Sequence, residues 1–225
     1  TRGVPMVPFL TFYSMFGFQR VGDLLWAAAD ARARGFLPGA TAGRTTLLGE
    51  GLQHQDGHSL LLASTVPTCR SYDPAFAFAM AAIIREGIAA MYEREEDVYY
   101  YLTLYNENYE MPPAPEGVTE ALLRGLYRWE AAPDGLGTDA PRATVLFSGT
   151  AHTAAREARD LLAERHGVAV DLWSATSYQQ LRVDAMEVER WNRLHPGEAR
   201  RTPYVTEALA ADDGPVVAVS DFMRA

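Results

Sequence analysis

Residues Gly49 to His58 carry the side chains in this sequence best suited to chemistry. The stretch reads Gly-Glu-Gly-Leu-Gln-His-Gln-Asp-Gly-His, so imidazoles and carboxylates stand among glycines. Glycine allows close backbone approach and positive φ, for which an ordinary surface loop has little need. Titratable side chains on such a loop favour proton transfer or contact with an anion. A polar turn whose histidines only cap their neighbours is an equally open interpretation at this point.

A zinc site is the first specific chemistry to weigh. His54 and His58 have the i, i+4 spacing that places two ligands on one helical face in HExxH proteins. However, no glutamate follows the first histidine, Gly57 disfavours a helix, and no third ligand is evident. Cys69 is the only cysteine and has no histidine beside it, so we interpret it as a packed thiol in a reducing compartment. The sequence therefore predicts no metal ligand.

Composition excludes several classes of protein. The chain has 225 residues, 48% of them hydrophobic, enough for one or two domains with their own cores. A net charge of −9 argues against a nucleic-acid surface, which needs clustered Lys and Arg. No apolar stretch approaches the ~20 residues that cross a bilayer, and both common glycine-rich nucleotide motifs are missing. These features favour a soluble cytoplasmic protein.

Alternating strands and helices must position the loop. In the first part, the pattern predicts a buried strand over 6–12, a helix over 19–34 that a glycine stops, and a short strand over 36–37. A longer helix over 73–92 and a central Tyr-rich strand over 98–104 follow. The second part predicts strands over 143–147, 168–173 and 216–219, with helices over 152–166, 178–194 and 203–209. Such alternation predicts α/β domains with parallel sheets.

A Pro-, Gly- and Asp-rich stretch divides these two parts. Residues 132–141 have the composition of a linker. We therefore expect one domain over residues 1–131 and another over 142–225.

Long, idiosyncratic strings resemble a known family. They include Pro8–Arg20, the Gly49–His58 loop, Ser71–Ala75, Asn106–Tyr109, Glu189–Asn192 and Ser220–Met223. These strings resemble the homodimeric, thiamine-diphosphate-dependent decarboxylating component of pyruvate dehydrogenase, and the match runs essentially end to end. More distant transketolases share only the aromatic strand and the acidic-histidine loop. The resemblance implies a transketolase-like α/β fold, comprising part of the middle, pyrimidine-binding domain and the start of the C-terminal domain.

The resemblance also implies roles for particular residues. Tyr13 and Phe16 would line the aminopyrimidine pocket, with the Phe16 ring stacked on the pyrimidine. Glu50, His54 and Tyr13 would act near the reacting carbon, where an imidazole orients the substrate carboxylate or relays protons. Asp56 belongs to the same loop, as does His58, and neither receives a role. Without the resemblance, the aromatic residues are read as core.

The implied activity is decarboxylation of pyruvate through thiamine diphosphate and acetylation of the lipoyl group of an acyltransferase, dihydrolipoyl acetyltransferase. The activating glutamate and the diphosphate and Mg²⁺ ligands would lie upstream, the latter in a domain supplied by the second subunit of a homodimer. The chain would then be an internal segment, inactive alone. We also expect it to self-associate through the exposed aromatic residues Phe9, Phe12, Phe16, Phe18 and Tyr99–Tyr101, and through a strand edge near Val219. A transketolase, another 2-oxo-acid decarboxylase and a non-catalytic truncated dimerisation module remain alternatives.

Overall fold

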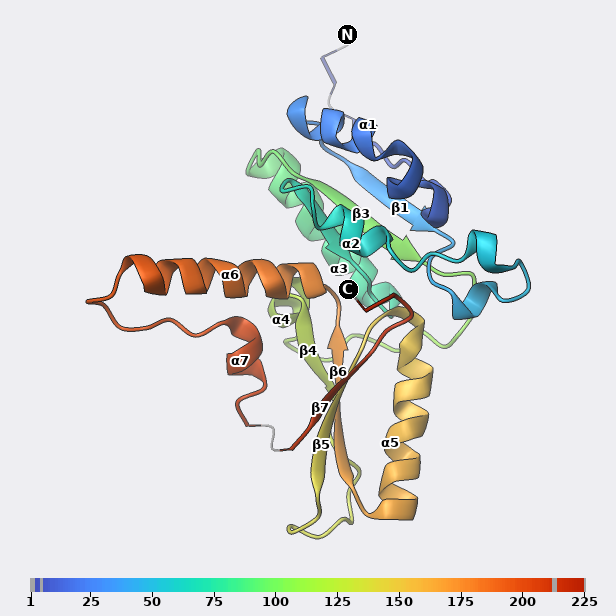
Figure 1. Cartoon of the computed structure of the whole chain (residues 1–225), viewed down its shortest axis with the longest axis vertical. Helices are drawn as coiled ribbons and strands as arrows, with labels where there is room; N and C mark the ends of the chain where they lie inside the picture. Colours follow the sequence, from blue (N-terminus) through green and yellow to red (C-terminus); the bar gives the residue numbers. More distant parts are fainter. Residues whose placement is uncertain (1–2, 5, 212–213, 225) are drawn as a thin grey trace. The chain divides into compact units, whose positions relative to one another are not determined.

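The chain forms two compact units in the computed structural model, which describes residues 3–4, 6–211 and 214–224. The first unit comprises Thr1–Pro112 and Asp221–Ala225, and the second comprises Pro113–Ser220 (Figure 1). The chain thus leaves the first unit after Pro112 and returns to it at Asp221. The stretch 132–141, expected to be an interdomain linker, instead connects strands β4 (Leu126–Glu130) and β5 (Arg142–Phe147) of the second unit. Pro- and Gly-rich composition marks a long connection, whether it lies within a domain or between domains.

A three-stranded parallel sheet organises the first unit. Its order is β1-β3-β2, with β1 over Phe36–Ala40, β3 over Tyr99–Leu104 and β2 over Cys69–Tyr72. The Tyr-rich strand is therefore central, as its sequence predicts. Tyr99, Tyr100 and Tyr101 are all buried, because a central strand of a parallel sheet is covered on both faces.

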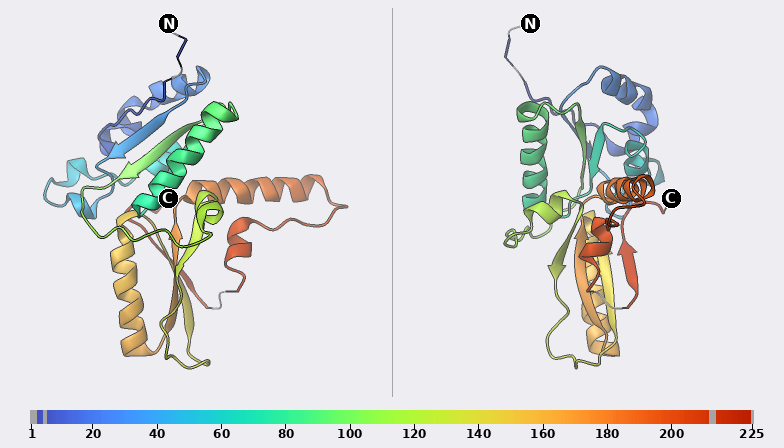
Figure 2. Two further views of the ribbon diagram at one scale, coloured as in Figure 1. Left: turned by 180° about the vertical axis from the view of Figure 1, so that it is seen from behind. Right: turned by 90° about the vertical axis from the view of Figure 1, so that its left-hand side faces the viewer.

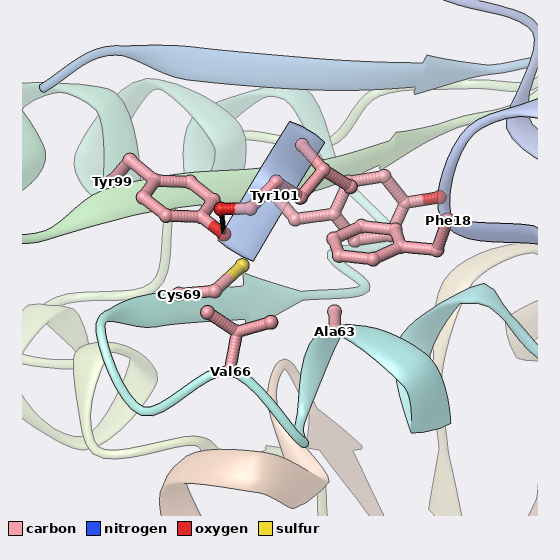
Figure 3. Packing of buried hydrophobic residues seen from close by; sticks show 7 residues of the cluster. Phe18, Ala63, Val66, Cys69, Tyr99 and Tyr101 are labelled. Atoms are coloured by element: carbon pink, nitrogen blue, oxygen red, sulfur yellow. Dashed lines mark hydrogen bonds between the residues drawn. The ribbon is translucent and has the colours of Figure 1, made fainter. Parts of the chain in front are cut away.

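Helices cover both faces of this sheet. Helix α1 (Phe18–Asp30) and helix α2 (Ser59–Ala63) lie on one face, and helix α3 (Ala77–Ile88) lies on the other (Figure 2). Successive residues of a strand point to opposite faces. Tyr99 and Tyr101 accordingly share one buried cluster with Phe18, whose ring contacts that of Tyr101 (Figure 3), whereas Tyr100 lies beside Gly87 of α3.

Several expected elements of the first unit differ from the structure. Helix α1 ends at Asp30, before the expected stop at Gly35, and β1 continues to Ala40. Helix α3 begins at Ala77 and not at Asp73, because the Asp73 carboxylate accepts hydrogen bonds from Thr103 and Tyr105 instead of capping the helix. The segment 6–12 was expected to be a buried strand. It runs extended beside β1 with only isolated bridges, and Phe9 and Leu10 remain 51% and 62% exposed. Pro8 has no N–H to donate to a ladder.

The second unit has a mixed four-stranded sheet in the order β4-β6-β5-β7. Strands β5, β6 (Ala169–Ala175) and β7 (Val216–Val219) are parallel, and the unexpected strand β4 is antiparallel to β6. Helices α5 (His152–His166) and α6 (Tyr178–Leu194) confirm the bounds expected from the sequence. Two short helices, α4 (Thr119–Leu123) and α7 (Tyr204–Ala208), complete the unit. Within the described residues, no helix combines the length and apolar character of a membrane span.

Candidate active site

The Gly49–His58 loop lies beyond the carboxyl end of β1. Short 3-10 turns shape the chain here, over Thr45–Leu47 and Leu52–His54. Another 3-10 turn, Ser14–Phe16, precedes α1 and carries the aromatic residues singled out by the sequence. In open parallel sheets, ligands bind outside the carboxyl ends of the strands. The fold therefore places the loop where a ligand site is expected.

The structure brings together the four residues that the resemblance pointed to. The hydroxyl of Tyr13 donates a hydrogen bond to Glu50. Nδ1 of His54 lies 3.7 Å from Oε2 of Glu50. The ring centroids of Tyr13 and His54 are 5.3 Å apart, and those of Phe16 and His54 are 5.8 Å apart. An acid, an imidazole, a phenol and an apolar ring thus form one cluster.

Hydrogen bonding affects the pKa of one member of this cluster, Tyr13. The bond to Glu50 raises the pKa of Tyr13 above its ordinary value, and a bond with Thr41 acts in the opposite direction. Tyr13 therefore stays protonated and donates this hydrogen bond. His54 Nδ1 is buried without a hydrogen-bond partner, since Glu50 is beyond hydrogen-bond distance. Buried polar atoms are nearly always satisfied, so this nitrogen is suited to a bound group.

The aromatic side of the cluster fits a flat heterocycle such as an aminopyrimidine. Phe16 is partly exposed, and the guanidinium carbon of Arg20 lies 4.7 Å from its ring centroid. A cation over one face leaves the opposite face of the ring for stacking. The Tyr13 ring lies 5.4 Å from this ring between centroids, and its hydroxyl and Glu50 offer polar atoms for the nitrogen atoms of a heterocycle.

Asp56 joins the aromatic turn to the loop. Its fully buried carboxylate accepts hydrogen bonds from the hydroxyls of Ser14 and Ser59. It also accepts from the backbone N–H of His58 at 3.1 Å and of Ser59 at 3.0 Å, and from the Gln19 amide at 3.3 Å. Asp56 therefore links the loop to the turn that carries Tyr13 and Phe16, whereas the exposed His58 contributes only its backbone to this network.

Sequence reasoning gave no role to two further residues at the loop. Ser14 bonds Asp56, and Asp221 bonds the backbone at Arg44 and Thr45. Hydroxyl and carboxylate residues are common, so only their neighbours in space distinguish these two. Among residues 3–4, 6–211 and 214–224, no group of three or more His, Cys, Asp or Glu could hold a metal ion.

Family models match both parts of the chain. Residues 2–112 match the pyruvate dehydrogenase E1 component middle domain, and residues 125–225 match the transketolase-like TK C-terminal domain. The pyruvate dehydrogenase E1 component of Pseudomonas aeruginosa is 52% identical over 224 residues, covering 100% of this chain and 25% of that protein. The one from Mycolicibacterium smegmatis is 56% identical over 227 residues, covering 100% of this chain and 24% of that protein.

A solved structure agrees on the fold. The transketolase from Leishmania mexicana has a TM-score of 0.66 at 16% identity, and the match covers 97% of this chain and 28% of that one. The chain spans about a quarter of the length of the curated relatives it matches. With family models on both parts and this identity over its whole length, the chain belongs to the pyruvate dehydrogenase E1 component family and has the transketolase-like α/β fold.

Proposed function

We propose that this chain supplies the pyrimidine side of a thiamine-diphosphate-dependent active site. The full-length protein decarboxylates pyruvate and acetylates the lipoyl group of a dihydrolipoyl acetyltransferase. The observation that carries this proposal is the single cluster of Tyr13, Phe16, Glu50 and His54 beyond a parallel sheet. The similar proteins, which are pyruvate dehydrogenase E1 components, support pyruvate as the substrate.

Each residue of the cluster has a role in this proposal. Phe16 stacks on the aminopyrimidine and excludes water from one side of it. Tyr13 completes the pocket and holds Glu50 through its hydrogen bond. When bound, thiamine diphosphate supplies the electron sink for loss of carbon dioxide.

Proton handling falls to Glu50 and His54. The Glu50 carboxylate lies 3.7 Å from Nδ1 of His54, so both side chains can act on the same bound molecule. The His54 imidazole would contact the carboxylate of the substrate and exchange a proton with the bound substrate.

Other components of the enzyme lie outside this cluster. We place the diphosphate and Mg²⁺ ligands and the activating glutamate in parts of the protein beyond this sequence, with the second subunit of a homodimer completing each site. The 225-residue chain alone is therefore expected to be inactive toward pyruvate. A cytoplasmic location is part of the same proposal.

The test is His54→Ala in a full-length enzyme that carries this chain. Removing one positioned acid–base group lowers kcat by roughly 10²–10⁴-fold, with thiamine diphosphate affinity retained. Carbon dioxide release from labelled pyruvate reports turnover, and calorimetry reports cofactor binding. His166→Ala, which removes an exposed histidine at the end of α5, is the control and should leave both unchanged. Normal turnover in His54→Ala would remove His54 from the chemistry.

A further inference from the structure

A short segment at the end of the chain crosses the base of the site loop. We call residues Asp221–Met223 the strap, and we call Gly43–Thr45 together with Gly57 the neck of the loop. The neck is closed by a backbone hydrogen bond of 2.8 Å from the Asp56 N–H to the Gly43 carbonyl. The strap contacts both sides of this neck.

Asp221 holds the first side of the neck. Its carboxylate, on a residue only 5% exposed, accepts the backbone N–H of Arg44 at 2.6 Å and of Thr45 at 3.0 Å. It thus satisfies N–H groups at the start of the 3-10 turn Thr45–Leu47, whose own N-cap residue offers no side-chain bond. Arg44 returns the contact, because its Nε donates to the Asp221 carbonyl at 2.7 Å.

Met223 holds the second side. Its N–H donates to the carbonyl of Gly57 at 2.9 Å. The strap therefore forms backbone or side-chain hydrogen bonds with both ends of a loop whose tip carries Glu50 and His54.

Glycines stand at the points where the strap comes close. A Cβ on Gly57 would lie 2.7 Å from Cγ of Met223. A Cβ on Gly43 would overlap the Asp221 carboxylate, and Gly43 also has a φ of +81°. Close approach by another segment is a reason for glycine that does not involve a ligand.

The loop itself has little packing to hold it. From Thr45 to Asp56, only Leu47 and Asp56 are buried, while Leu48 and Leu52 are 74% and 81% exposed. A segment with few buried apolar contacts opens at low free energy unless its ends are fixed. Ties at the neck therefore matter more here than they would for a packed loop.

We propose that the strap is a positioning element that keeps Glu50 and His54 against Tyr13, with Asp221 as its principal residue. The claim that the strap stabilises the loop does not depend on the proposed function. The consequence for turnover rests on the proposed function.

The hold is tested on the chain itself by amide hydrogen exchange over residues 44–57. Asp221→Ala should speed exchange there by about tenfold, the size expected for loss of one cap. Asp221→Asn keeps an acceptor oxygen and should restore most of the protection. Asp184→Ala is the matched control, since the Asp184 carboxylate accepts the Tyr204 N–H at 2.7 Å in the second unit. Unchanged exchange in Asp221→Ala, or equal changes in both alanine variants, would overturn the proposal.

Arg44→Ala provides a second route if Asp221→Ala does not fold, because it keeps the cap and removes the side chain that grips the strap. Faster exchange over 44–57 supports the proposal, and unchanged exchange contradicts it.

Turnover is tested in a full-length enzyme that carries the chain. Asp221→Ala should lower kcat by about tenfold and shift its pH profile, while Asp184→Ala should do neither. A drop in kcat for His54→Ala together with a normal kcat for Asp221→Ala would overturn the strap and leave the proposed function intact. A normal kcat for His54→Ala would instead count against the proposed function, and the exchange result would stand alone.

Discussion

Two buried carboxylates, one in each unit, are stabilised by different kinds of hydrogen-bond donor. Asp171 in the second unit accepts hydrogen bonds from Arg128 and Arg142 and from the Ala132 N–H at 2.9 Å. Asp56 in the first unit accepts only from hydroxyl, amide and backbone N–H donors. The arginine pair joins three strands of a sheet through Asp171, whereas the neutral donors to Asp56 join a loop to the turn before α1. In our proposal, Asp171 has a structural role and Asp56 supports the site.

Asp56→Ala should give the largest loss of stability. The change leaves several buried donors without an acceptor, so we expect the first unit to lose about 3 kcal/mol. Asp56→Asn, which keeps one acceptor oxygen, should lose less than half of that. Urea unfolding, followed by NMR signals from residues of each unit separately, measures the loss of stability. Equal losses in the two variants would mean that the cavity, and not the hydrogen bonds, sets the effect.

Gly43→Ala should come next. The new methyl group meets the Asp221 carboxylate and lies 2.8 Å from Cε1 of Tyr105, at a φ that an L residue rarely adopts. We expect a loss of about 2 kcal/mol. Gly49→Ala is the matched control, because a Cβ there meets nothing within 4 Å. Similar melting temperatures for the two variants would show that the neck is not tightly packed.

The arginine-paired carboxylate predicts a smaller, pH-dependent effect. Burial acts to raise the pKa of Asp171, but the hydrogen bonds from Arg128 and other donors outweigh it and hold that pKa below its ordinary value. A lowered folded-state pKa stabilises the protein above the unfolded pKa, and the contribution disappears as the pH falls through the folded pKa.

We therefore expect the second unit to lose stability below about pH 4. The two arginine side chains are 48% and 42% exposed, so screening limits the contribution to about 1 kcal/mol. Asp171→Asn should remove this acid dependence, and denaturant melts between acidic and neutral pH measure it. An unchanged acid transition in the variant would contradict the assignment.

Each unit has an exposed sheet edge with apolar side chains. Self-association was expected from Phe12, Phe16, Phe18 and the tyrosines of β3, but these are buried or half-buried. Among the exposed apolar residues are two at sheet edges, Phe9 on the extended segment beside β1 at 51% and Val217 on the edge strand β7 at 50%. Such edges pair with other chains unless a charge protects them.

The chain should therefore self-associate at tens of micromolar, and Phe9→Lys or Val217→Lys should reduce the scattering. Light scattering of the two variants shows which edge mediates the association. Leu161→Lys on α5 is the control for an added charge at an exposed apolar position. A monomer in the unsubstituted chain would contradict this expectation.

Regular elements were the most predictable part of the structure. Helices α5 and α6 follow a long amphipathic pattern, and the β-rich run of β3 identifies a central strand. Strand β2 is too short and polar to stand out, and β4 ends in charged residues. The site was harder, because Tyr13 and Glu50 are 37 residues apart, and the resemblance, not the spacing, indicated both. Asp221 and Arg44 are 177 residues apart, and no local pattern encodes such a pair.

The most direct test of the site is a crystal structure of a full-length enzyme that carries this chain, with thiamine diphosphate bound. We predict the aminopyrimidine on the face of Phe16 opposite Arg20, with ring centroids roughly 4.5–7 Å apart, and His54 beside the reacting carbon. A cofactor bound away from Phe16, with the cluster of Tyr13, Glu50 and His54 unchanged and contacting nothing, would contradict it.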